Sequence, residues 1–248
     1  MKVIAFINQK GGVGKTTSCL NMGAALALMG NSVLLIDFDP QGSLTKNLGI
    51  RNLSGQSTVY EVLSGSAEIR SSIIKLGKYD LLPIDTRMAG SEDQFKGKET
   101  LLRKVLDPIR KDYDYCLIDC SPALNRFPVM ALAAADRAII VSSALFSAAD
   151  GLLQVMDTLY YVLNTYKKDL AAYLLITLYD GRRSLDRETV KFIKNRYPMT
   201  FENVVKFNIK VAEAPIMGQD IFEYDPKGSA AAAYMAVTKE FLERENKK

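Results

Sequence analysis

Residues Asn8 to Thr17, NQKGGVGKTT, place three glycines, two lysines and two threonines within ten positions. Such a cluster can bind phosphate, because the backbone N–H groups of a glycine-rich turn and of a helix N-terminus point at an anion. An apolar run precedes the cluster and a helix-patterned segment follows it, as a phosphate-binding loop requires. We expect Lys15 to reach the β- and γ-phosphates of a nucleotide and the Thr16 hydroxyl to complete the coordination of Mg²⁺.

This loop departs from the regular motif GxxxxGK[ST], which would place glycine where the chain has Gln9. Its pattern is instead KGGxGKT, in which Gly11 and Gly12 supply the tight turn and Gly14 lets the backbone approach the phosphates. The stretch expected to contact the nucleotide therefore consists of Gly11, Gly12, Val13, Gly14, Lys15, Thr16 and Thr17.

Two carboxylate positions fit the same site, because each follows a predicted strand. Asp119 ends the run DYCLID, at the edge of the sheet where an outer ligand of Mg²⁺ is needed. Asp39 lies in DFDPQG, where Pro40 and Gly42 indicate a shaped, movable loop, and we expect it to orient the attacking water. Asp37 either fixes that loop or assists at the metal, and the sequence leaves this choice open.

Short apolar runs alternate with helix-patterned segments, as in βαβ units whose parallel strands are buried on both faces. The expected strands are Lys2–Asn8, Ser32–Asp37, Tyr79–Pro83, Asp114–Asp119, Arg137–Ser142 and Tyr173–Leu178. The expected helices are Lys15–Met29, Glu99–Arg110, Phe127–Ala135, Ala149–Tyr166, Asp186–Arg196 and Ser229–Glu243, with a short helix at Val59–Leu63 inside a surface excursion from Ile50 to Ser72. This alternation predicts a doubly wound, mostly parallel α/β sheet flanked by helices.

Length and composition favour a single α/β domain over residues 1–248, with 48% hydrophobic and 24% charged residues. No apolar run reaches the roughly 18 residues of a transmembrane helix or resembles a signal peptide, so we expect a cytoplasmic protein. The chain has three cysteines and no histidine. Cys116 and Cys120 share one face of a predicted strand, which favours core packing over a metal site.

Taken together, KGGVGKTT, DFDPQG and DYCLIDCSP resemble the ParA/Soj partition ATPases, P-loop NTPases of the deviant Walker A class. The likeness extends over SAADGLL (147–153), TLYDGR (177–182) and KVAEAPIMGQDIFEYDP (210–226). It implies an ATP- and Mg²⁺-dependent homodimer that binds DNA without sequence preference, associates with the nucleoid when ATP-bound, and hydrolyses ATP slowly until a ParB-type partner stimulates it. It also implies that Lys10 crosses the dimer interface to the phosphates of the partner's ATP, which would offset charge as an arginine finger does.

The chain departs from this family at two places. Lys206, Phe207 and Asn208 replace the usual PRN. Asn208 can still hydrogen-bond the adenine edge, whereas Phe207 could stack on the base but, as an aromatic beside a strand, is more often a core residue. Arg126 follows the Mg²⁺ aspartate in CSPALNRFPVM, and we expect it to be solvated rather than to serve a partner.

Positive charge is concentrated between residues 182 and 210, which hold eight lysines and arginines against three acidic residues, a net charge of +5 in a chain of +4 overall. A basic surface of this kind suits sequence-independent contact with DNA phosphates. The candidates for DNA contact are Arg182, Arg183, Arg196, Lys206 and Lys210.

Three other functions are alternatives to DNA partition. A ParA-like ATPase that positions a protein cargo would share this chemistry, and the sequence does not separate the two. A MinD-like membrane-cycling ATPase needs an amphipathic C-terminal anchor, but the last six residues contain no apolar side chain. A reductase like the nitrogenase iron protein needs cluster-ligating cysteines on the dimer face, which Cys116 and Cys120 do not supply. Because the chain begins at the first strand, we also expect no N-terminal helix-turn-helix domain and no operator-specific DNA binding.

Overall fold

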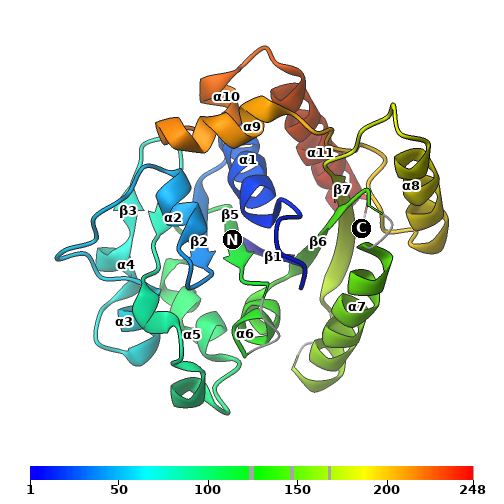
Figure 1. Cartoon of the computed structure of the whole chain (residues 1–248). Coiled ribbons are helices and arrows are strands. Elements are labelled where there is room, and N and C mark those ends of the chain that lie inside the picture. The colour runs from blue at the N-terminus through cyan, green and yellow to red at the C-terminus, as the bar shows by residue number, and fades with distance from the viewer. Residues whose placement is uncertain (123–125, 146–147, 167–168, 248) are drawn as a thin grey trace.

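The computed structural model describes residues 1–122, 126–145, 148–166 and 169–247, and of residues 148–151 it describes the backbone alone. Its strands are β1 (Lys2–Ile7), β2 (Val33–Phe38), β3 (Ile74–Lys75), β4 (Asp80–Leu82), β5 (Tyr115–Cys120), β6 (Arg137–Ser143) and β7 (Ala171–Thr177). These strands form one sheet in the order β3-β4-β2-β5-β1-β6-β7. All neighbours are parallel except β3 and β4, which run antiparallel at one edge (Figure 1). The predicted doubly wound, mostly parallel α/β sheet is confirmed.

Helices cover both faces of this sheet (Figure 1). The α-helices are α1 (Lys15–Leu28), α2 (Ser43–Asn47), α3 (Val59–Ser64), α4 (Ile69–Ser72), α5 (Leu101–Leu106), α6 (Arg126–Ala134), α7 (Ala148–Thr165), α8 (Ser184–Arg196), α9 (Ile209–Glu213), α10 (Ile221–Tyr224) and α11 (Ser229–Asn246). Short 3₁₀ turns are η1 (Thr86–Met88), η2 (Glu92–Phe95), η3 (Asp107–Ile109) and η4 (Ala214–Met217).

The alternation of β1 side chains explains the two hydrophobic cores. Val3, Ala5 and Ile7 pack with residues of α3, α5, α6 and α7, whereas Ile4 and Phe6 pack with residues of α1 and α11. Successive strand residues point to opposite faces, so a central parallel strand is apolar along most of its length. Cys116 and Cys120 are buried in the first of these cores as free thiols, as their spacing predicted.

Two predicted segments differ from the structure in their bounds or in their burial. The helix expected over Glu99–Arg110 is the short α5, which tightens into η3 at Pro108. Proline has no N–H to continue the α-helical ladder, and it is tolerated at the start of the new turn. The short helix expected at Val59–Leu63 is present as α3, but the stretch from Ile50 to Ser72 is more than a surface excursion, because it also forms α4 and buries Val59 and Ile69 in the core.

Within the part of the chain that the structure describes, no helix is both long and apolar enough to cross a bilayer.

Candidate nucleotide site

The phosphate loop joins β1 to α1 at the carboxyl edge of the sheet. Gly12 and Gly14 have φ of 72° and 84°, a left-handed backbone that residues with a Cβ rarely adopt. Asn8 anchors the start of the loop: its side-chain amide donates to the Val141 carbonyl at 2.6 Å, and its side-chain oxygen accepts from the Lys10 amide at 2.9 Å. The loop is therefore fixed to β6 before the first glycine.

The Thr177 hydroxyl at the end of β7 holds the middle of the loop by donating to the Val13 carbonyl at 2.7 Å. A buried carbonyl in a tight turn needs such a donor. The Val13 side chain is buried, so this residue faces the phosphate region only through its backbone. Sequence reasoning missed this role of Thr177, which lies 164 residues away along the chain.

Lys15 is almost completely buried, with 7% of its surface exposed. Its ammonium donates to the Lys10 carbonyl at 3.1 Å. Burial lowers the pKa of Lys15, because it penalises the charged form, and the negative charge of Asp119 opposes this effect. A buried ammonium on a loop rich in backbone N–H groups suits the binding of a polyanion.

Asp119 is fully buried at the end of β5, and neither of its carboxylate oxygens has a hydrogen bond that meets normal geometry within the described residues. Burial raises the pKa of Asp119, and so does the charge of Asp37, its register partner on β2; the nearby Thr16 hydroxyl and Lys15 oppose this rise. An orphaned buried carboxylate beside a threonine hydroxyl is the oxygen donor set that Mg²⁺ prefers. These residues therefore fit the predicted metal.

Asp37 fixes the loop after β2, one of the two roles that the sequence left open. One carboxylate oxygen accepts from the Thr45 amide at 2.8 Å and from its hydroxyl at 2.7 Å, and the other accepts from the Asp39 amide at 3.3 Å. Burial raises the pKa of Asp37 to about 7, against the effect of these hydrogen bonds. Asp39 is less buried, and its own carboxylate accepts from the Gln41 amide at 3.0 Å.

A cavity of about 420 Å³ joins the phosphate loop to Asp39, whereas Lys10, Val13, Asp37 and Asp119 are not among its described lining residues. Its lining includes the predicted Gly11, Gly12, Gly14, Lys15, Thr16, Thr17, Asp39 and Asn208, together with residues that were not predicted, among them Ser43, Asn47, Thr177, Val205 and Tyr234. The structure thus brings the phosphate loop, the loop after β2 and the segment before α9 around one space, which lies within the size range of small-ligand sites.

The segment from Lys206 to Asn208 forms part of the wall of the cavity. Phe207 is 65% exposed and lines the cavity, so its expected place in the core was wrong. The reason is the backbone: the Phe207 amide bonds to the Tyr179 carbonyl beyond the end of β7, where no sheet lies beneath the ring. The Asn208 oxygen caps α9 by accepting from the Lys210 amide at 3.0 Å, and its side-chain nitrogen donates to the Ser229 hydroxyl at 3.2 Å.

Arg126 forms an ion pair instead of being merely solvated, which corrects the prediction. Its guanidinium lies 3.0 Å from the carboxylate of Glu99, a buried residue. The contact ties the start of α6 to the segment before α5. Asn125 and the two residues before it lie outside the described residues, as does Ser147 of the segment SAADGLL.

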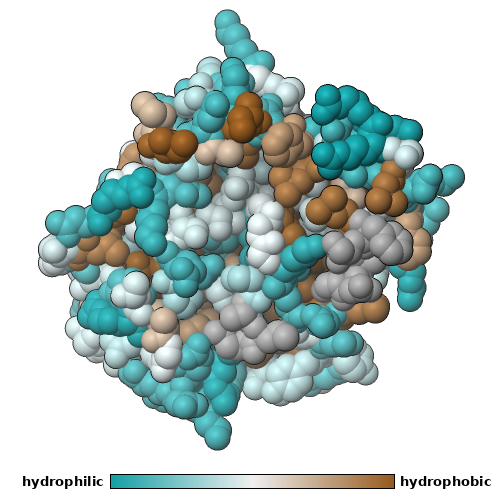
Figure 2. Space-filling model, in the orientation of Figure 1, coloured by the Kyte–Doolittle hydropathy of each residue, from teal (hydrophilic) through white to brown (hydrophobic). Residues whose placement is uncertain are grey.

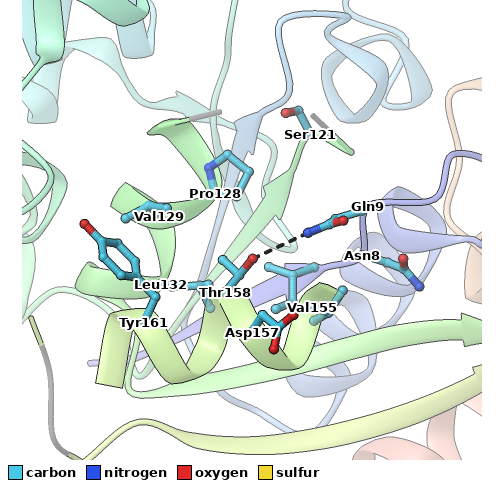
Figure 3. Close-up of a pocket in the computed structure, with 11 residues that line it drawn as sticks. Asn8, Gln9, Ser121, Pro128, Val129, Leu132, Val155, Asp157, Thr158 and Tyr161 are labelled. Carbon is cyan, nitrogen blue, oxygen red and sulfur yellow. Dashed lines mark hydrogen bonds between the residues drawn. The ribbon is translucent and has the colours of Figure 1, made fainter. Parts of the chain in front are cut away.

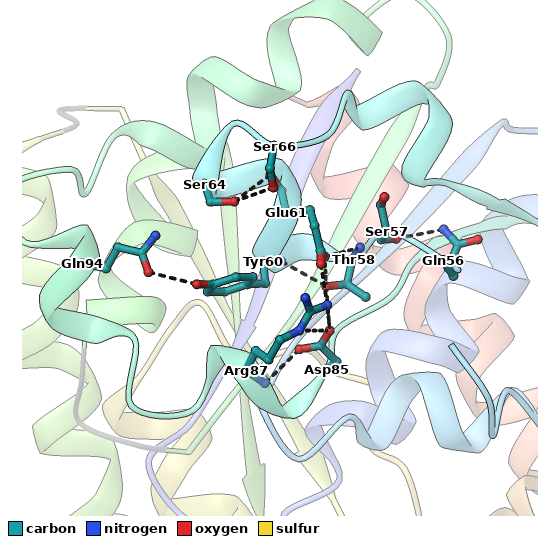
Figure 4. Close-up of polar contacts among 10 residues, drawn as sticks. All are labelled: Gln56, Ser57, Thr58, Tyr60, Glu61, Ser64, Ser66, Asp85, Arg87 and Gln94. Atoms are coloured by element: carbon teal, nitrogen blue, oxygen red, sulfur yellow. Dashed lines mark hydrogen bonds and ion pairs between the residues drawn. The ribbon is translucent and has the colours of Figure 1, made fainter. Parts of the chain in front are cut away.

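A second arginine organises the region between α3 and η1 (Figure 4). The Arg87 guanidinium bridges Asp85 and Glu61 and stacks over the Tyr60 ring, 5.3 Å from its centre. Glu61 also completes a capping box with Thr58 at the start of α3. The S/T-x-x-E pattern, TVYE, carries this signal in the sequence. These contacts are structural, since none of these residues lines the nucleotide cavity.

The candidate DNA-contact residues lie in three places. Arg182 and Arg183 both form ion pairs with Asp180 in the exposed turn before α8, and Lys206 forms a β-bridge with Tyr179 beside that turn. Arg196 lies at the other end of α8, and Lys210, on α9, pairs with Asp225 at 3.2 Å. Figure 2 shows strongly hydrophilic surface at the upper right, where the turn before α8 lies, and apolar surface over α9. The structure therefore places Arg182, Arg183 and Lys206 at the turn before α8, with Lys210 four residues beyond Lys206 on α9 and Arg196 at the other end of α8.

This fold and this loop define a P-loop ATPase with a variant phosphate loop. The sequence profile of the AAA domain family matches residues 1–172. The chain is 37% identical to the "Chromosome partitioning protein ParA" of Caulobacter vibrioides, covering 99% of this chain and 95% of that protein. It is 35% identical to the "Sporulation initiation inhibitor protein Soj" of Bacillus subtilis, covering 96% and 97%. The chain belongs to the ParA/Soj family of partition ATPases.

Solved structures agree with this assignment. A cobyrinic acid a,c-diamide synthase of Mycobacterium smegmatis with bound ATP analogue and magnesium superposes with a TM-score of 0.84 at 31% identity, covering 99% of this chain and 96% of that one. A putative plasmid partition protein of Borrelia burgdorferi bound to AMPPNP gives a TM-score of 0.80 at 26% identity, covering 98% of both chains.

Proposed function

We propose that this protein is an ATP- and Mg²⁺-dependent ATPase that dimerises on ATP, binds DNA without sequence preference and drives plasmid or chromosome partition with a ParB-type partner. The observation that carries the proposal is the buried Lys15 beside the orphaned Asp119, at the carboxyl edge of the sheet in a chain of the ParA/Soj family. The relatives' names and the nucleotides in the similar structures support it.

The residues of the phosphate loop would bind the nucleotide's phosphates. Lys15 supplies one positive charge, and the backbone N–H groups of Gly11 to Thr17 supply donors. The Thr16 hydroxyl and Asp119 would hold Mg²⁺, which when bound neutralises charge on the β- and γ-phosphates. Because Asp119 and Lys15 are buried, their charges act in a poorly solvated space, where electrostatic interactions are stronger.

Asp39 would orient the attacking water. Asp39 lies on the loop that Asp37 fixes, and it lines the same cavity as Lys15. Its carboxylate therefore has a defined position relative to Lys15. Lys10 would act on the nucleotide of the other subunit. Two-fold symmetry then gives each site one Lys15 from its own chain and one Lys10 from the partner.

For the base, the cavity wall supports stacking on Phe207, with the predicted contact of Asn208 as a second element. The Asn208 side chain already makes two hydrogen bonds that begin α9 and tie it to α11, so contact with adenine would compete with them. Stacking of a base on the Phe207 ring would break none of these hydrogen bonds, and every base has a π-face that can stack.

The proposal is tested by comparing wild type, Lys15→Ala and Asp39→Ala for binding of labelled ATP, dimer mass and retention on DNA. Lys15→Ala should fail to bind ATP. Asp39→Ala should form an ATP-bound dimer on DNA whose turnover is lower by roughly a hundredfold, a typical effect of removing a general base. Asp93→Ala, at an exposed position of η2, is the matched loss of a carboxylate and should behave as wild type. Normal hydrolysis by Asp39→Ala would refute the catalytic role of this residue.

A further inference from the structure

Two glycines bring the backbones of α2 and η4 into direct contact. Gly49 follows α2, Gly218 follows η4, and both have a left-handed backbone, with φ of 76° and 70°. A Cβ atom on Gly218 would lie 3.2 Å from the Gly49 Cα atom and 3.3 Å from the Gly49 nitrogen. Contacts this short would require one of the two backbones to move by a few tenths of an ångström. The absence of a side chain at position 218 therefore sets how closely α2 and η4 approach each other.

This contact joins two walls of the nucleotide cavity. Asn47 of α2 lines the cavity, and so does Asn208, which begins α9. The helix α9 is followed directly by η4, with no loop between them, and its start is tied to α11 by the hydrogen bond from Asn208 to Ser229. Gly49 and Gly218 are therefore the place where the wall that follows β2 meets the wall proposed to hold the base.

A series of hydrogen bonds connects Gly49 to the residue proposed to orient the attacking water. The Ile50 amide, next in the chain to Gly49, donates to the Thr45 carbonyl at 3.3 Å. The Thr45 amide and hydroxyl donate to the buried Asp37 carboxylate, which also accepts from the Asp39 amide. Because each of these groups holds the next, a displacement of Gly49 would also displace the backbone of Asp39.

The phosphate loop, in contrast, is anchored to other elements. Figure 3 shows the Gln9 side chain directed at Thr158 of α7, and its nitrogen donates to the Thr158 hydroxyl at 3.4 Å. Farther along the loop, the Val13 carbonyl accepts from the Thr177 hydroxyl of β7. These partners lie on neither α2 nor η4. We therefore expect a shift at Gly218 to leave the phosphate loop in place.

We propose, on the basis of the proposed catalytic role of Asp39, that Gly49 and Gly218 are positioning residues for ATP hydrolysis. Their contact holds Asp39 in its place relative to the bound nucleotide, and it contributes little to the binding of the phosphates. A misplacement of about 1 Å by a distant substitution can lower an enzymatic rate by about a hundredfold. A shift of a few tenths of an ångström should therefore be measurable as a loss of turnover.

Gly218→Ala should lower the single-turnover rate of ATP hydrolysis by roughly tenfold and keep the dissociation constant of ATP within about threefold of wild type. Gly55→Ala is the matched control, because Gly55 also has φ of 76° but no atom lies within 4 Å of an added Cβ atom. Both variants carry the strain of a side chain on a left-handed backbone, and the contact with Gly49 distinguishes them. Equal rates in the two variants would overturn the proposal.

The Asp39→Ala background tests whether the effect passes through Asp39. Adding Gly218→Ala to Asp39→Ala should cause no further loss of rate, because the displaced carboxylate is already absent. A general loss of structure would instead lower the rate by the same factor in both backgrounds, and that result would refute the positioning role. Normal hydrolysis by Asp39→Ala alone would refute the catalytic role of Asp39, and this proposal with it.

A second substitution keeps the test decisive if Gly218→Ala does not fold. Gly218→Asn introduces a Cβ atom at the same place in a residue type that tolerates a left-handed backbone. Its matched control is Gly55→Asn, at the exposed position without a close neighbour. The same loss of rate is expected in Gly218→Asn, and a rate equal to that of Gly55→Asn would overturn the proposal.

Discussion

The Lys15 ammonium donates a hydrogen bond of 3.1 Å to the carbonyl oxygen of Lys10. Lys15, which is proposed to act in its own subunit, therefore holds the backbone of Lys10, which is proposed to act in the other subunit. The Asn8 side chain holds the same residue from its amide side. The backbone of Lys10 is therefore fixed at both its N–H and its C=O. A side chain that must reach across an interface gains from such a fixed origin, because less freedom is lost when the contact forms.

We predict that Lys10→Ala binds ATP within about threefold of wild type but does not form the ATP-dependent dimer, because its ammonium is needed only where a second subunit's phosphates approach. The measurement is labelled-ATP binding alongside dimer mass. Lys10→Arg keeps the positive charge and should retain part of the dimer. Loss of ATP binding in Lys10→Ala as severe as in Lys15→Ala would show instead that Lys10 serves the site of its own chain.

The sheet could be predicted from the sequence because its central strands are buried on both faces and are therefore apolar along most of their length, as in VLLI at the start of β2. The phosphate loop could be predicted because its chemistry is local. Edge strand β3 has only two residues and carries no such pattern. Thr177 and Tyr234 line the cavity because the fold brings together residues that are far apart in the sequence, so no local pattern predicts their place there. The exposure of Phe207 was mispredicted for the same reason, because it depends on where β7 ends.

Phe207→Ala should weaken ATP binding by a factor of roughly 5 to 150, since base–aromatic stacking is worth about 1–3 kcal/mol by alanine substitution. Phe207→Tyr should keep most of the affinity. Ile216→Ala is the matched control, because Ile216 is also highly exposed but does not line the cavity. Stacking tolerates any base, so the same substitution should weaken GTP binding by a similar factor. An unchanged dissociation constant for ATP in Phe207→Ala would exclude stacking.

The double substitution Arg182→Ala/Arg183→Ala should weaken DNA binding in the presence of ATP and reduce the steepness of its salt dependence. Each phosphate contact contributes about −0.9 to the slope of log K against log salt, so loss of two contacts should change the slope by about 2. The pair Arg103→Ala/Lys104→Ala, exposed on α5, removes the same charge from another surface. Equal salt slopes for the two double variants would show that the turn before α8 does not contact DNA.

The last prediction concerns Glu245, which ties the end of α11 to the amino edge of the sheet. Its carboxylate accepts from Lys2 at 2.6 Å, from Arg137 at 2.7 Å and from the Tyr173 hydroxyl. Burial by itself raises the pKa of Glu245, but these hydrogen bonds outweigh it and lower the pKa from 4.5 to about 2. A depressed pKa means that the folded state favours the ionised form, so the stabilisation is complete above about pH 4.5 and is lost as the pH falls toward 2.

Glu245→Gln should therefore lower the free energy of unfolding at pH 7 by about 1–3 kcal/mol, as expected when a charged partner of a buried network is removed. The difference from wild type should shrink between pH 4.5 and pH 2, where wild-type Glu245 itself becomes protonated. Urea unfolding at a series of pH values measures both effects. Glu243→Gln, an exposed position on the same helix, should change stability by less than about 0.5 kcal/mol. A deficit in Glu245→Gln that stayed constant down to pH 2 would mean that the contribution of Glu245 comes from packing and not from its charge.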